Sequence, residues 1–121
     1  MTQTVLARVG GFARVRHVVS AFYDRVLDSE VLQRHFAGID MTRLVDHQTK
    51  LVAGLMAGDH ALDDALLQRV HARLGITGPE FDTLQRLLHE TLEEFGYDPC
   101  DVDRVCHEFR RRRHLIVAEA A

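Results

Sequence analysis

The sequence predicts an all-α fold in a single domain, residues 1–121. Apolar residues recur at helical spacing in at least four segments, and no stretch of useful length alternates apolar and polar residues as a half-buried strand would. Only two prolines occur, at positions 79 and 99. A chain of 121 residues is long enough to bury one modest core. These observations favour helices packed around a single core.

The first long helix is expected over residues 12–27. Gly10 and Gly11 precede it and should end any shorter helix before them. The segment "LDSEVLQRHF" that follows reads as a turn and a short helix. The apolar stripe of the long helix comprises Phe12, Val15, Val19, Phe22, Tyr23 and Val26.

The second long helix is expected over residues 40–56, with Asp40 as its N-cap and Gly58-Asp59 at its end. Its apolar stripe comprises Leu44, His47, Gln48, Leu51, Val52 and Leu55. The opposite face is expected to meet water and comprises Thr42, Arg43, Asp46, Thr49 and Lys50. Two polar side chains, His47 and Gln48, therefore lie inside an apolar stripe, where burial is costly unless a partner satisfies them.

The next segment, residues 59–66, is polar and irregular. A short helix that carries Leu67 and His71 at i, i+4 spacing should follow it and end at Gly75. Thr77 and Glu80 then form a capping box for a further helix, which Gly96 ends. The apolar stripe of that helix comprises Phe81, Leu84, Leu88, Leu92 and Phe95.

The last helix is expected to begin with Asp98 as cap and Pro99 in its first turn. Its stripe comprises Val102, Val105, Cys106, Phe109 and Ile116. The two C-terminal helices should form an antiparallel hairpin, and the helices over 12–27 and 40–56 should pack against it.

Composition argues against several classes of protein. The net charge is −3, and no apolar run approaches the length of a membrane span. The N-terminus lacks a signal-peptide pattern, so we expect a soluble, cytoplasmic chain. Separately, we expect a monomer. The arginine run "FRRRRHL" at 109–115 reads as a solvated helix end rather than a nucleic-acid site. Cys100 and Cys106 read as reduced structural thiols.

Four polar groups on apolar helical faces suggest a shared cavity. A lone histidine on such a face is more often a core residue bonded to a backbone carbonyl. Here His47, His71, Tyr23 and Gln48 come from three helices, and one metal or polar ligand would satisfy them together. The histidines assigned to the surface or rim are His17, His35, His60, His89 and His107, which form no convincing zinc set.

Several motifs now occur in an order that resembles the group I (N-type) truncated haemoglobins. They are "GG" near the start, Phe22-Tyr23, Phe36 with "AGIDM", "HQ" at 47–48, a glycine at the end of that helix, and "H…GIT…F" from His71 to Phe81. The resemblance covers nearly the whole chain. Two departures are Gly58-Asp59 in place of a glycine pair and a shorter segment before His71.

The resemblance implies a two-over-two helical sandwich around haem b. His71 would be the proximal iron ligand, and Phe36 would pack on the porphyrin. The distal side would be lined by Tyr23, Leu44, His47 and Gln48, and further pocket contacts would come from Leu51, Leu67, Ile76, Phe81 and Leu84. Cations for the propionates would come from Lys50, Arg43 or Arg73.

Two histidines leave alternatives open. Some cyanobacterial and algal members use a histidine at the position of His47 to ligate iron, so we expect bis-histidyl coordination by His47 and His71. The alternative is a distal His47 that bonds ligand, water or a propionate. His114 lands where some members join a histidine to a haem vinyl group, but it lies off the apolar stripe and is expected to face solvent.

The resemblance implies binding of dioxygen and nitric oxide, with Tyr23 and Gln48 as hydrogen-bond donors to the bound gas. Nitric oxide dioxygenation, which yields nitrate, would need a separate reductase because the chain carries no flavin or nicotinamide motif. The alternatives are a gas or redox sensor that acts through a partner or output domain, and a haem-free helical interaction domain.

Overall fold

The computed structural model describes residues 4–57 and 75–117, and within these ranges it contains helices and no strand. The elements are α1 (Val5–Arg8), α2 (Phe12–Asp28), the 3₁₀ helix η1 (Gln33–Phe36), α3 (Met41–Met56), α5 (Gly78–Glu94), α6 (Pro99–Arg111) and α7 (Arg113–Ile116). Gly58-Asp59, His60, Leu67, His71 and Arg73 lie outside the described residues. The predicted helix through 67 and 71 therefore stays a prediction.

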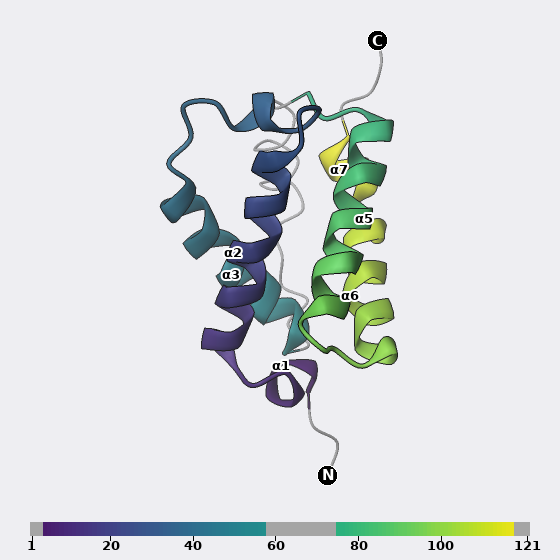
Figure 1. Cartoon of the computed structure of the whole chain (residues 1–121). Helices are drawn as coiled ribbons and strands as arrows, with labels where there is room; N and C mark the ends of the chain where they lie inside the picture. The colour runs from purple at the N-terminus through teal and green to yellow at the C-terminus, as the bar shows by residue number, and fades with distance from the viewer. Residues whose placement is uncertain (1–3, 58–74, 118–121) are drawn as a thin grey trace.

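The helices form two pairs, as the sequence predicts. The α2–α3 pair packs against the antiparallel α5–α6 hairpin, chiefly through α2 and α5 (Figure 1). None of the described helices has the length and apolarity needed to cross a membrane.

Side-chain caps mark the starts of α1, α3 and α5. The Asp40 carboxylate accepts a hydrogen bond from the Arg43 amide at 3.2 Å, and Thr77 and Glu80 complete the predicted capping box. Gly96 ends α5 with a φ of +79°, a conformation that costs glycine little. Asp98 occupies the N-cap position of α6, but its side chain makes no cap hydrogen bond.

The buried face of α2 differs from the predicted stripe at two positions. Phe12 is the first residue of the helix and is 48% exposed, so its assignment to the core was wrong. Val18, which the stripe omits, is buried against Leu92 and Val102. α2 thus contacts both α3 and the hairpin, and a single stripe is too narrow for two neighbours.

α3 also buries more than one face. Thr49 was expected to meet water, but it is fully buried together with Val45, Ala53 and Met56. Its hydroxyl donates to the Val45 carbonyl at 2.6 Å, so its polar group is satisfied within the helix and burial costs little. The predicted stripe through Gln48 and Leu51 lies on the neighbouring face and remains only half-buried.

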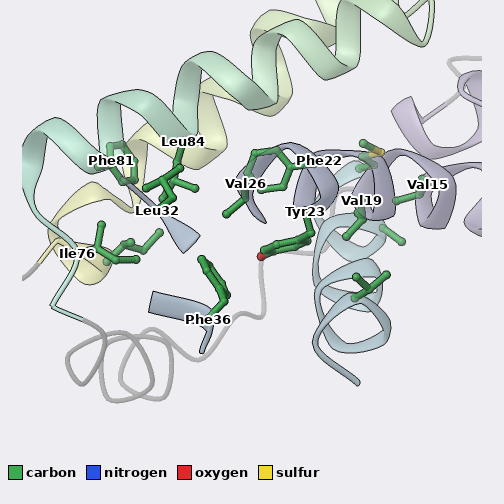
Figure 2. Close-up of a cluster of buried hydrophobic side chains, with 14 of the residues drawn as sticks. Val15, Val19, Phe22, Tyr23, Val26, Leu32, Phe36, Ile76, Phe81 and Leu84 are labelled. Atoms are coloured by element: carbon green, nitrogen blue, oxygen red, sulfur yellow. The ribbon is translucent and has the colours of Figure 1, made fainter. Parts of the chain in front are cut away.

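The last helix is interrupted, although one continuous helix was predicted. α6 ends at Arg111, Arg112 leaves helical geometry, and α7 carries Leu115 and Ile116 into the core. Phe81 is fully buried and stacks on Phe109, with ring centroids 4.7 Å apart. Figure 2 shows Phe81, Leu84, Leu32 and Ile76 gathered at this end of the core.

The arginine run is largely paired with carboxylates. Arg111 and Arg112 pair with Glu108, and Arg113 pairs with Asp82 and lies over the Phe81 ring. Arg110, Arg111 and Arg113 are exposed, which agrees with a solvated helix end, whereas the Arg112 side chain is only 12% exposed. Cys100 and Cys106 are both free thiols, exposed and buried respectively.

Candidate functional site

A cavity of about 440 Å³ lies between the two helix pairs and has a mostly apolar wall. Its volume falls within the usual range for small-molecule and cofactor sites. Its lining residues come from α2, η1, α3, α5 and the segment just before α5, and include Val19, Phe22, Tyr23, Phe36, Gln48, Leu51, Val52, Leu55, Ile76, Leu84 and Leu88. Val105, Phe109 and Ile116 close it from the C-terminal helices.

One polar pair interrupts this wall. The Gln48 amide nitrogen donates to the Tyr23 hydroxyl oxygen at 3.0 Å, which joins α3 to α2. The Tyr23 ring is held edge-on by Phe22 and Phe36, at centroid distances of 5.0 and 5.9 Å. In Figure 2 the Tyr23 hydroxyl points toward the space beside Phe36.

The Tyr23 hydroxyl stays neutral and keeps its proton. Burial raises the pKa of Tyr23 from 10.0 to about 12, against a smaller opposing effect of the Gln48 hydrogen bond. Because the oxygen already accepts from Gln48, its own O–H is free to donate. Within the described part of the chain it has no acceptor. The pair therefore presents a hydrogen-bond donor to whatever occupies the cavity.

Six of the predicted site residues line this one cavity: Tyr23, Phe36, Gln48, Leu51, Ile76 and Leu84. Leu44 is half-buried and packs on the core without lining the cavity, and Phe81 lies behind the wall. Leu67 and His71 lie outside the described residues, so their predicted contacts with a cofactor are untested.

His47 is exposed and does not belong to the cavity lining. It precedes Gln48 on α3, and successive residues of a helix point about 100° apart. The proposed rim cations Arg43 and Lys50 are exposed as well, as is His114 on α7. The solvent-facing position predicted for His114 agrees with the structure.

Sequence reasoning missed a polar edge of the cavity on α6. Arg104, Glu108 and Arg112 line it at i, i+4 and i+8 spacing, beside the recognised stripe of Val105 and Phe109. The Arg112 guanidinium pairs with Glu108 at 2.8 Å and lowers the pKa of that carboxyl. The regular spacing was a usable signal, but the surrounding arginine run obscured it.

The sequence also misplaced His35, which was assigned to the surface or rim. Its side chain is only 8% exposed, and its Nε2 lies 2.8 Å from a carboxylate oxygen of Glu80. No local sequence pattern predicts this contact, because the two partners are 45 residues apart in the chain.

Comparisons with known proteins identify relatives of the whole fold. A family model described as bacterial-like globin matches residues 4–118. The group 1 truncated hemoglobin GlbN of Synechocystis sp. is 30% identical over 97 residues, which cover 77% of this chain and 78% of that protein. GlbN of Mycolicibacterium paratuberculosis is 33% identical over 93 residues, covering 77% and 68% of the two chains.

Solved structures show the same architecture. Truncated hemoglobin from Tetrahymena pyriformis in its Fe(III) form has a TM-score of 0.84 at 22% identity and covers 97% of this chain and 100% of that one. The 2/2 hemoglobin from Synechococcus sp. PCC 7002, solved in the cyanomet state with covalently attached heme, has a TM-score of 0.83 at 25% identity. It covers 95% of this chain and 98% of that one.

Proposed function

The chain belongs to the bacterial-like globin family as a group I truncated haemoglobin, and from this premise we propose that it binds haem b and converts dioxygen and nitric oxide to nitrate. The observation that carries the proposal is the Tyr23–Gln48 pair at the wall of a mostly apolar cavity.

The residues present fit a haem. The apolar lining residues Phe36, Leu51, Ile76 and Leu84 would contact the macrocycle, whose burial would be the main source of affinity. Positive charge for the haem propionates would come from Arg104 and Arg112 at the α6 edge or from Arg43 and Lys50 on α3. His71, by its place in the family motif, would hold the iron from the proximal side. Haem, when bound, would supply an iron centre that takes up dioxygen and exchanges electrons.

The distal pair would act on the gas. A diatomic ligand that draws electron density from iron would carry a partial negative charge, and the buried Tyr23 O–H would be a hydrogen-bond donor to it in a mostly apolar site. A hydrogen bond of about 1.5 kcal/mol to such a charge slows escape of the gas roughly tenfold when the bond is lost on the way out. Gln48 orients that donor by occupying the lone pair of Tyr23.

We further propose that His47 ligates iron from the distal side when no gas is bound. Support comes from its place on α3 beside Gln48 and from the family resemblance. The exposed imidazole would have to turn inward, so this coordination requires a local rearrangement of α3. If the open form were about 1% of molecules, apparent gas affinity would fall about 100-fold.

Spectroscopy of His47→Leu tests this internal ligand. The chain should show low-spin, six-coordinate spectra without gas, and His47→Leu should convert them to high spin. High-spin spectra near neutral pH in both proteins would reject bis-histidyl coordination and leave the gas chemistry standing.

The turnover itself is tested by rapid mixing. The reduced chain, equilibrated with dioxygen, is mixed with nitric oxide while nitrate and the absorption spectrum are followed. Nitrate should form in step with oxidation of the haem, and a separate reductase should be needed for a second turnover. Persistence of the dioxygen-bound spectrum over seconds would exclude the activity.

A further inference from the structure

One buried carboxylate ties two separate parts of the cavity wall together. Glu80, near the start of α5, is only 4% exposed. One of its oxygens accepts the Thr77 amide at 2.9 Å, and the other accepts His35 Nε2 at 2.8 Å and Arg34 at 3.1 Å. The contact joins η1 to the N-terminus of α5.

The partners leave this carboxylate ionised. Burial acts to raise the pKa of Glu80, but the hydrogen bonds from Thr77, His35 and Arg34 outweigh it and lower the pKa to about 2. The Arg34 side chain is 68% exposed, so its ion pair with Glu80 adds little to stability, as is usual for ion pairs at the surface. The His35 side chain is only 8% exposed, so its bond to Glu80 is an enclosed polar link between η1 and α5, in addition to the packing of η1 on α2.

Each end of the bridge adjoins a residue of the cavity wall. His35 immediately precedes Phe36, whose ring lies edge-on to Tyr23, and Ile76 immediately precedes Thr77. Phe36 and Ile76 both belong to the buried cluster drawn in Figure 2. η1 is a single 3₁₀ turn, a geometry with weak hydrogen bonds, so it needs an outside support to keep Phe36 in place.

We propose that Glu80 is a positioning residue for the gas site: by holding His35 it fixes Phe36 against Tyr23 and so sets both haem retention and the distal hydrogen bond. The proposal rests on the proposed haem binding. Its contacts cross from η1 to α5, which distinguishes it from the capping role that Glu80 also plays within its own helix.

Glu80→Gln separates these two roles. The amide oxygen of glutamine can still accept from Thr77, which keeps the cap, but its NH₂ group would replace the ionised oxygen that faces His35 and Arg34. His35→Leu removes the bridge without touching the capping box and should reproduce the effect. Glu90→Gln is the matched control, since Glu90 is an exposed carboxylate paired with Arg86 on the same helix.

The first measurement needs no haem. Amide hydrogen exchange in residues 33–39 of the full chain should become about tenfold faster in Glu80→Gln and His35→Leu. Exchange in α2 should stay unchanged, and Glu90→Gln should exchange like wild type. Unchanged exchange in both bridge variants would overturn the proposal. This readout still decides the bridge if the chain takes up no haem, an outcome that would overturn the proposed function instead.

The second measurement asks whether Glu80 acts through Phe36. Transfer of haem to an excess of apomyoglobin should become about tenfold faster in Glu80→Gln, and the iron–CO stretching frequency should shift as Tyr23 moves. Phe36→Leu should do the same, and Glu80→Gln should add less than about twofold in that background. If the combined variant loses haem faster by the product of the two single effects, Glu80 acts independently of Phe36. That result would refute the positioning role.

Discussion

At the residue scale, the distal donor is the most direct link between structure and chemistry. Tyr23→Phe removes the hydroxyl but keeps the ring against Phe22 and Phe36. Because one hydrogen bond to a charged group is lost, release of dioxygen should become roughly tenfold faster or more. Stopped-flow displacement of dioxygen by CO measures this rate.

The chain offers a matched control in its other tyrosine. Tyr97 is half-buried, lies outside the cavity lining, and its hydroxyl has no partner within the described residues. Tyr97→Phe removes an unsatisfied buried group, so it should leave dioxygen release unchanged and cost no stability. Equal release rates in Tyr23→Phe and wild type would contradict the assigned donor.

Residue-level prediction from sequence worked where a polar side chain interrupted an apolar stripe. Tyr23 and Gln48 stood out in this way, and they meet in the cavity. It failed for Thr49 and His35, whose burial depends on hydrogen bonds that hydrophobic spacing does not reveal. For His47, spacing placed a side chain on the stripe, whereas the structure leaves it exposed.

At the element scale, α3 buries a face that the pattern assigned to water. Thr49→Glu places a charge at a fully buried position, so the free energy of unfolding should fall by about 3 kcal/mol or more. Thr42 was assigned to the same face but is exposed in the first turn of α3, where a negative charge suits the helix dipole. Thr42→Glu should therefore cost little stability, and urea unfolding of Thr49→Glu and Thr42→Glu measures the difference. Similar losses in both variants would contradict the buried position of Thr49.

The start of α5 should respond to acid through Glu80. Its pKa is lowered by folding, so its stabilising effect is complete above the unfolded pKa near 4.5 and is lost as the pH falls toward about 2. Glu80→Gln should be less stable than wild type by about 2 kcal/mol near neutral pH, because a buried charged partner is lost.

The pH dependence of that difference is the decisive readout. In urea unfolding of the haem-free chain, the gap between wild type and Glu80→Gln should be constant above about pH 5 and narrow below it. Glu90→Gln should follow wild type at every pH. A gap that stays constant down to pH 3 or so would contradict the lowered pKa.

Helix boundaries were predictable wherever a cap marked them. Asp40, the Thr77–Glu80 box and Gly96 all act as their residue types suggest. The break at Arg112 was not predictable, since neither glycine nor proline marks it. It depends on tertiary packing that brings Leu115 and Ile116 into the core.

At the scale of the whole molecule, the two helix pairs were predictable but the cavity between them was not. An amphipathic stripe predicts which face of a helix is buried, but it does not predict whether a neighbouring helix or a ligand covers that face. The half-buried face of α3, with Gln48, Leu51 and Leu55, is the part of the pattern that a ligand would complete. Family membership, rather than periodicity, identifies that ligand class.

Haem binding should therefore stabilise the whole chain and depend on position 71. At a free haem concentration 100 times the Kd, the free energy of unfolding should rise by about 2.7 kcal/mol, since haem binds the folded chain preferentially. His71→Ala removes the proposed axial bond while the apolar walls remain. Haem affinity should then fall by at least about 100-fold, which cancels most of that stabilisation. Titration with haem measures the affinity, and unfolding experiments with and without haem measure the stabilisation. His89→Ala is the control, because His89 lies on the exposed part of α5 beside Glu93. A His71→Ala protein that keeps the wild-type affinity and axial-ligand spectrum would show that iron is held elsewhere.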